Sequence, residues 1–173
     1  MPVTSAANSG TFKVSTPSDN QICITRLFDA PRPLVFEAFT NPKHVRRWWG
    51  CLGDGYSVPV CEADLSVGGS WKYVNQTPKG ELASFYGVYR EITPPKRLVF
   101  TEIYEPFPDG ESVVTAEFTE RAGKTLLTLT AEYPSIDVRD MVLKSGMEYG
   151  AALSYDRLEE IASELARESS TPT

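Results

Sequence analysis

Apolar and polar positions alternate through the middle of the chain and then change to a helical period near the C-terminus. Alternating or β-branched runs predict strands, and turns rich in Gly and Pro separate them. Consecutive strands joined by short turns pair as antiparallel hairpins. The expected strands are residues 22–28, 56–61, 70–74, 82–92, 98–104, 113–118 and about 127–133.

The helical pattern has two parts. Between the first and second strands, Asn41-Pro42 supplies an N-cap and a first helical residue, so two short helices are expected there, the second ending at Gly50. From about residue 137 to 167, apolar residues recur at spacings of three and four, which predicts one long amphipathic helix. Gly146 and Gly150 are expected inside it, where a helix packs closely on a sheet or beside a cavity.

This order of elements predicts an α+β fold. An antiparallel sheet of about six or seven strands has one apolar face to cover, and the long C-terminal helix is the one large element left to cover it. We expect the sheet to curve around this helix and to leave an apolar cavity between them. Residues 20–167 form a single domain in this interpretation, with disordered tails at residues 1–19 and 168–173.

Composition narrows the classes of function. The net charge is −6 and the sequence pI is about 4.9, which argues against nucleic acid and anionic membranes as partners. There is no apolar run of membrane-spanning length and no secretory signal, so a cytoplasmic location is expected. Three cysteines and one histidine in no metal-binding spacing argue against a disulfide framework and a metal site, and no glycine loop suits an organic cofactor. His44 is expected on a solvated helix surface.

Several segments resemble one known family. The resemblance is to the Activator of Hsp90 ATPase homologue 1-like family, of the START-like or SRPBCC (polyketide cyclase, Bet v 1-like) superfamily. It covers about residues 20–166 and is carried by residues 29–31, 35–42, 47–50, 64–69, 87–101, 146–150 and 154–158. It implies a helix-grip fold with a deep cavity between the sheet and the final helix. It also implies an apolar ligand, such as a lipid, hormone or polyketide, and no shared catalytic residues.

One position departs from the family pattern. Relatives often carry Trp directly after the second Gly of the final helix, where this chain has Ala151. A methyl group in place of an indole is expected to enlarge or reshape the cavity near Gly150.

Aromatic residues are the main candidates for lining that cavity. Trp71 and Tyr73 share one face of a strand, as do Phe100, Glu102 and Tyr104 on another. Small-molecule sites are typically lined by aromatic side chains with a few polar groups, although inward aromatics also build plain cores. The full set of candidate ligand-binding residues is Trp48, Trp49, Trp71, Tyr73, Phe100, Glu102, Tyr104, Met147 and Ala151.

Glu102 is the one candidate for catalysis. If it points inward, its carboxyl is desolvated, its pKa is raised, and it can act as an acid or base or bind a polar ligand group. If the strand face has already opened to water at that point, the carboxyl is merely solvated.

Three hypotheses of function follow. The first is a protein that binds a small apolar or aromatic molecule without a cofactor. The second is a cyclase- or hydrolase-like enzyme that uses a cavity carboxylate. The third is a co-chaperone-like interaction module, which we would expect to carry a separate N-terminal domain that is absent from this chain. Exposed strand edges also permit a homodimer.

Overall fold

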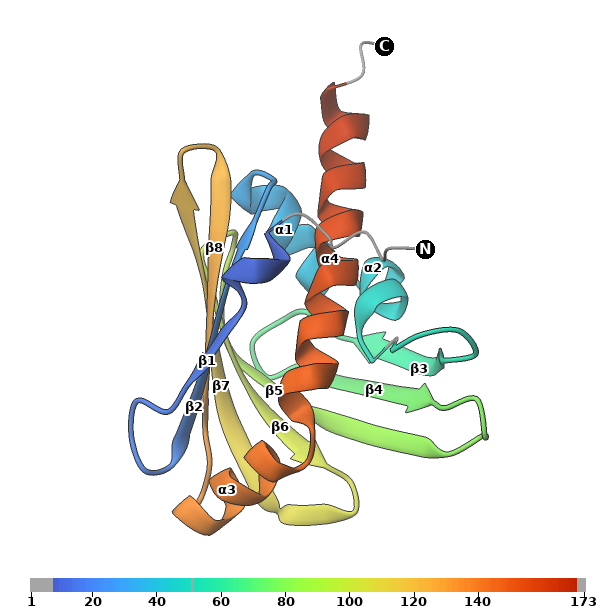
Figure 1. The fold of residues 1–173 in the computed structure, drawn as a ribbon, viewed down its shortest axis with the longest axis vertical. Helices are drawn as coiled ribbons and strands as arrows, with labels where there is room; N and C mark the ends of the chain where they lie inside the picture. The colour runs from blue at the N-terminus through green and yellow to red at the C-terminus, as the bar shows by residue number, and fades with distance from the viewer. Residues whose placement is uncertain (1–7, 51, 171–173) are drawn as a thin grey trace.

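An eight-stranded antiparallel sheet curves around a long C-terminal helix, α4, in a computed structural model that describes residues 8–50 and 52–170 (Figure 1). The strand order is β1-β2-β8-β7-β6-β5-β4-β3. The strands are β1 (Lys13–Ser15), β2 (Gln21–Phe28), β3 (Ser57–Ala63), β4 (Ser70–Gln76), β5 (Leu82–Thr93), β6 (Arg97–Tyr104), β7 (Phe107–Arg121) and β8 (Lys124–Glu132). The helical segments are η1 (Ser9–Thr11), α1 (Arg32–Thr40), α2 (Pro42–Trp48), α3 (Ile136–Lys144) and α4 (Met147–Ser170).

This architecture confirms the predicted α+β class and helix-grip fold. Seven of the strands correspond to the seven alternating runs, and β1 is the additional one. Alternation decides which side chains face α4: every second residue of β2, from Ile22 to Phe28, is buried, while those between are half-buried. The same alternation buries Val114, Ala116 and Phe118 of β7.

The two short helices close one end of the curved sheet. α1 buries Val35, Phe36 and Ala38, and α2 packs against both α4 and β3. The Asn41 side chain accepts a 3.0 Å hydrogen bond from the Lys43 N–H, so it caps α2 as its position before Pro42 predicts. His44, expected at a solvated surface, is instead buried, because the face of α2 that carries it is covered within this packing.

The predicted single helix over residues 137–167 is wrong in one respect. The chain leaves the helical path after Lys144 and begins a new helix, α4, at Met147. Gly146 has a φ of 86°, a left-handed conformation that glycine adopts without strain and that a continuous helix excludes. The expected close packing at the two glycines is also absent. A Cβ at Gly146 would meet nothing within 4 Å, and one at Gly150 would meet only Leu52, at 3.8 Å.

The structure also corrects the expected terminal tails within the residues that it describes. β1 pairs with β2, with Val14 opposite Ile24. The Asn8 side chain donates a 2.7 Å hydrogen bond to Glu159 of α4. At the other end, α4 continues to Ser170. Residues 1–7 and 171–173 of the expected tails lie outside the described residues.

A buried arginine ties α4 to the sheet. Arg26 is fully buried in β2 and forms a 2.8 Å ion pair with Asp156, while Glu159 lies 3.8 Å away. Glu159 also accepts a 2.9 Å hydrogen bond from the Asp29 backbone N–H. These contacts hold the middle of α4 against β2, and the space toward the N-terminal end of α4 becomes the cavity described next.

Candidate functional site

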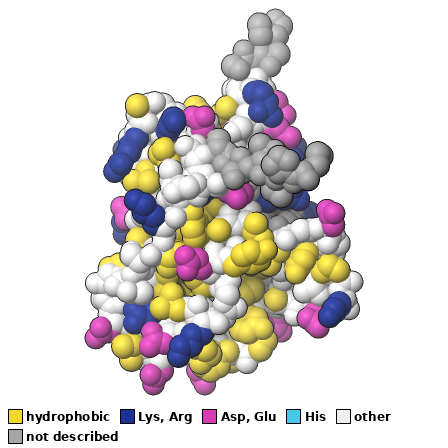
Figure 2. Space-filling model, in the orientation of Figure 1, with side chains coloured by type: hydrophobic (Ala, Val, Ile, Leu, Met, Phe, Trp, Pro, Cys, Tyr) yellow, Lys and Arg dark blue, Asp and Glu magenta, His cyan; other side chains and the backbone are white. Residues whose placement is uncertain are grey.

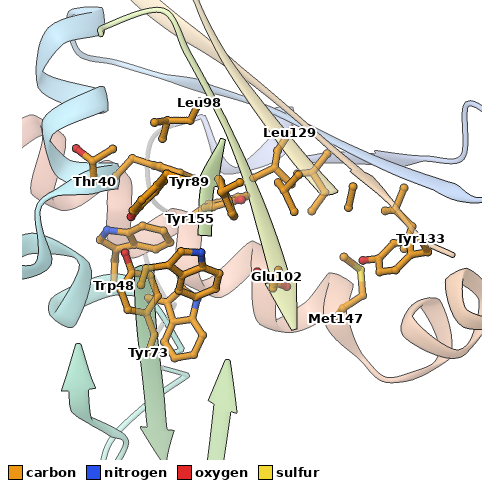
Figure 3. A pocket seen from close by; sticks show the side chains of 18 residues that line it. Thr40, Trp48, Tyr73, Tyr89, Leu98, Glu102, Leu129, Tyr133, Met147 and Tyr155 are labelled. Carbon is orange, nitrogen blue, oxygen red and sulfur yellow. The ribbon is translucent and has the colours of Figure 1, made fainter. Parts of the chain in front are cut away.

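A cavity of about 180 Å³ lies between the inner face of the sheet and α4 (Figure 3). Six of the eight strands, β2 and β4 to β8, contribute to its wall, together with α1, α2 and the N-terminal half of α4. Its lining residues are Ile22, Ile24, Phe39, Thr40, Trp48, Trp49, Trp71, Tyr73, Tyr89, Leu98, Phe100, Glu102, Val114, Leu129, Ala131, Tyr133, Met147 and Tyr155. Among the described residues, the lining contains no Lys, Arg or His, and its one strongly acidic or basic group is the Glu102 carboxyl.

Hydrogen bonds to the backbone fix two of the indole rings. Trp48 Nε1 donates a 2.8 Å bond to the carbonyl of Ala38 in α1. Trp71 Nε1 donates a 3.1 Å bond to the carbonyl of Thr101 in β6. A ring whose one polar atom is bonded to the main chain presents an apolar face to the cavity without an unsatisfied donor.

Contacts between rings form two aromatic groups, one around each of these indoles. The Trp71 ring centroid lies 4.8 Å from that of Tyr73 and 5.8 Å from that of Phe100. Trp49 meets Tyr73 edge-on at 5.4 Å, and Trp48 lies 6.0 Å from Tyr155 of α4. Such offset and edge-to-face arrangements are the favoured ones for aromatic pairs, so this part of the cavity is a preformed aromatic surface.

Four tyrosine hydroxyls provide polar points around the cavity. Burial raises the pKa of Tyr73, Tyr89, Tyr133 and Tyr155, so these groups stay neutral at physiological pH. A hydrogen bond joins the Tyr73 and Tyr89 side chains; it raises the pKa of Tyr73 and opposes the rise for Tyr89, as expected if Tyr73 donates. Neutral hydroxyls can donate to or accept from a ligand.

Glu102 lies between the aromatic group around Trp48 and Tyr73 and the opposite end at Tyr133 and Met147 (Figure 3). Glu102 keeps some accessible surface because its side chain faces the cavity, although protein atoms surround that side chain. Burial raises the pKa of its carboxyl from 4.5 to about 7. Among the described residues, no side chain donates a hydrogen bond to this carboxyl or forms an ion pair with it.

The structure brings together most of the side chains that the sequence analysis selected. The selected residues that line the cavity are Trp48, Trp49, Trp71, Tyr73, Phe100, Glu102 and Met147. Tyr104 and Ala151 do not line it.

Tyr104 departs from the expected parity because the ladder between β6 and β7 shifts register between Glu102 and Tyr104. Its ring packs 5.1 Å from that of Phe85, and the residue remains 43% exposed. Ala151 is half-buried on α4 and packs against the core instead of the cavity.

Three lining tyrosines were not selected from the sequence. Tyr89 lies two residues after Gly87 on β5, so the two residues are on the same face of the sheet. This alternation is the one pattern that could have indicated Tyr89 as a lining residue. Tyr155 comes from α4 and Tyr133 from the segment just after β8, and nothing in their local sequence distinguishes them from core or loop residues. Their place in the lining depends on how α4 crosses the sheet.

Within residues 8–50 and 52–170, no group of three His, Cys, Asp or Glu side chains is arranged to hold a metal ion. In the same residues, no helix is long and apolar enough to cross a membrane. Cys23 and Cys61 are free thiols, and Cys51 lies outside the described residues.

Comparison with known proteins identifies the family. The family model described as Activator of Hsp90 ATPase homolog 1-like protein matches residues 29–163, well over half of the chain. The chain belongs to this family. The family and its START-like relatives commonly bind small hydrophobic ligands, and the cavity occupies the place between sheet and helix that the helix-grip fold provides.

Solved structures of similar proteins show the same fold. A protein from Rhodobacter sphaeroides is 24% identical, with a TM-score of 0.81, over 88% of this chain and 99% of that one. Ms6760 from Mycobacterium smegmatis is 25% identical, with a TM-score of 0.75, over 93% and 98% of the two chains. A protein from Nitrosomonas europaea is 23% identical, with a TM-score of 0.75, over 87% and 98%. No curated protein matches the chain significantly.

Proposed function

We infer that this protein binds a small apolar or aromatic molecule in the cavity between the sheet and α4. The observation that carries this inference is a preformed aromatic wall around a space that the protein's own side chains leave unfilled. Protein interiors are otherwise packed to high density, so a cavity of this kind is uncommon in a core that serves stability alone.

The size of the cavity limits the ligand. An apolar cavity of roughly 150 Å³ is large enough to hold benzene, whereas sites for drug-sized ligands usually exceed about 300 Å³. At about 180 Å³, this cavity suits one ring with a short substituent. A steroid or a long acyl chain would require the walls to move apart.

The surface beside the cavity is suited to the approach of such a molecule. Hydrophobic side chains gather in the middle and lower part of the face that α4 crosses (Figure 2). Met147 lines the cavity directly after the α3–α4 break, and Tyr149 and Met141 on either side of it are 70% and 53% exposed. Exposed apolar groups of this kind commonly mark a binding surface.

The direct test is the binding of toluene to the purified chain, measured by calorimetry or by NMR shifts of the indole N–H groups. We expect binding to the native protein and a loss of at least about tenfold for Ala131→Leu, because the longer side chain fills part of the cavity. Thr128→Leu is the matched control, since Thr128 lies on the same strand but on the opposite parity. If toluene did not bind, or if both variants bound it as the native chain does, the proposal would fail.

Co-purifying molecules provide an independent test with the natural ligand. Mass spectrometry of small molecules released from the native protein should detect a one-ring apolar compound that is missing from Ala131→Leu prepared in the same way. Recovery of the same compounds from both preparations would contradict occupancy of this cavity.

One observation also supports an enzymatic alternative. A carboxyl with a pKa of about 7 is well matched to general acid–base catalysis at neutral pH. In that case Glu102→Gln would abolish turnover of a bound substrate while leaving the fold and the binding of toluene intact. Retained turnover in this variant would exclude Glu102 as the catalytic group.

A further inference from the structure

The cavity combines an aromatic wall with a single carboxyl that lacks a partner. The Trp71 ring contacts that of Tyr73 on its own strand, β4, and that of Phe100 on β6, across the intervening β5. Glu102 projects from the same strand as Phe100. Ring faces attract cations through their quadrupole, and a carboxylate attracts them by charge. The two features together make a site for one small organic cation.

We propose that the molecule bound in this cavity is a small aromatic amine derivative, an arylalkylammonium whose charged nitrogen pairs with the Glu102 carboxylate while its ring packs against the aromatic wall. The proposal rests on the proposed function and names the chemical class of its ligand.

The charges around Glu102 favour a cation over an anion. Three tyrosines that line the cavity lie near enough to be affected by its charge: Tyr73 from β4, Tyr133 after β8 and Tyr155 from α4. The negative charge of Glu102 raises the pKa of each of them in addition to the larger effect of burial. All three are neutral, and no basic side chain from the described part of the chain lines the cavity. A carboxylate ligand, such as a fatty acid, would therefore place a second negative charge beside Glu102 with nothing to balance it.

The unpaired state of Glu102 also favours a cation over a neutral ligand. Its desolvation is already present in the folded protein, because protein atoms surround the carboxyl where it faces the cavity, and this burial raises its pKa to about 7. A bound ammonium would give the carboxylate the partner that the protein does not supply, so the attraction is gained without removing the carboxylate from water at the moment of binding. The ammonium itself must lose water, and the ring faces of the aromatic wall offset part of that loss.

The ligand must also fit the available length. The cavity extends from Trp48 and Tyr73 at one end to Tyr133 and Met147 at the other, with Glu102 between them (Figure 3). A ring at the aromatic end with one carbon between ring and nitrogen brings the nitrogen toward the middle, and a volume of about 180 Å³ leaves little room for a second ring.

The experiment compares four probes of nearly equal shape on the full chain: toluene, benzyl alcohol, benzylamine and benzoate. We expect benzylamine to bind at least about tenfold more tightly than benzyl alcohol or toluene at pH 8, and benzoate to bind most weakly. Between pH 8 and pH 6 the affinity for benzylamine should fall by about tenfold, because Glu102 becomes largely protonated while an alkylammonium stays charged, as lysine does. The affinity for toluene should stay constant.

Two variants locate the effect. Glu102→Gln should bind benzylamine no more tightly than benzyl alcohol and should lose the dependence on pH. Glu105→Gln removes a carboxyl from an exposed residue near the end of the same strand and should retain both the preference and the dependence on pH. The comparison of probes on the native chain needs no variant, so it still decides the question if Glu102→Gln does not fold.

The outcomes separate this proposal from the one on which it rests. If toluene and benzyl alcohol bound as tightly as benzylamine, the ammonium proposal would be overturned while the proposed function stood. Tightest binding of benzoate would overturn it as well. If none of the four probes bound to the native chain, the proposed function and this inference would fail together.

Discussion

The indole of Trp71 reaches across β5 to bond with Thr101 on β6, at an Nε1-to-carbonyl distance of 3.1 Å. This is possible because the residue beside Trp71 on the intervening strand is Gly87. A Cβ at Gly87 would collide with the Thr101 carbonyl and would lie 2.7 Å from Trp71 Nε1. The glycine is therefore required by a close approach, and it sets one wall of the cavity next to Glu102.

The first prediction concerns this contact. Gly87→Ala should lower the free energy of unfolding by about 3 kcal/mol, because the methyl group displaces Trp71 and breaks its hydrogen bond. Urea denaturation measures the change. Gly10→Ala is the control, since a Cβ there would meet nothing within 4 Å, and its effect should stay within about 0.5 kcal/mol. Equal effects of the two substitutions would contradict the account of Trp71.

The second prediction compares the two glycines near the start of α4. Gly146→Ala should destabilise the protein by about 1 kcal/mol, because a left-handed φ of 86° is strained for alanine. Gly150→Ala should instead stabilise it by up to about 1 kcal/mol, since Gly150 is inside the helix and a Cβ would only touch Leu52. Thermal or urea unfolding of both variants checks the opposite signs. A continuous helix through residue 146 would make both substitutions stabilising.

The third prediction uses the titration of Glu102. Its pKa is raised from 4.5 to about 7, so the unfolded chain releases this proton at lower pH than the folded one. The contribution of this group to stability is fully present below about pH 4.5 and is lost as pH rises to about 7. The free energy of unfolding of Glu102→Gln, measured relative to the native chain, should therefore rise by about 2 kcal/mol between pH 5 and pH 8.

Denaturation at the two pH values measures this difference. Glu105→Gln should show no such gain, because that residue is exposed. A difference between the native chain and Glu102→Gln that does not change with pH would mean that Glu102 is solvated in the folded protein.

The fourth prediction concerns the buried ion pair that holds α4. Arg26→Leu should destabilise the protein by about 3 kcal/mol, because it leaves the buried Glu159 without its arginine. Arg97 also has two acidic neighbours, Glu91 at 3.0 Å and Glu117 at 3.6 Å, but all three side chains are more than two-fifths exposed. Arg97→Leu should therefore lower the free energy of unfolding by less than about 1 kcal/mol. A decrease as large as that of Arg26→Leu would contradict this prediction.

Much of the fold could be predicted from local pattern. The seven alternating runs became strands, and Asn41 caps α2 as expected. The parity of β6 placed Glu102 and Phe100 toward the apolar side, where both line the cavity. Local pattern succeeds here because alternation along a strand directly decides which face a side chain occupies.

The same rule failed where the pairing of strands changes. Tyr104 shares the parity of Glu102, but the register shift between them in the β6–β7 ladder leaves Tyr104 packed on Phe85 and partly exposed. A register shift depends on the partner strand, so it cannot be read from one strand alone. The β5–β6 ladder also shifts register, between Tyr89 and Glu91, whereas Gly87 on β5 serves the approach of Trp71.

The sequence by itself determined that a curved antiparallel sheet would bury one aromatic-rich face beneath a C-terminal helix, because the period of apolar residues is a local property of each element. Only the tertiary structure decided that the helix breaks at Gly146 and that Arg26 finds its acidic partners on α4. It also decided that Tyr89, Tyr133 and Tyr155 join Glu102 around one cavity. These facts depend on how elements distant in the chain cross one another, and that geometry fixes which side chains meet and how much space they leave.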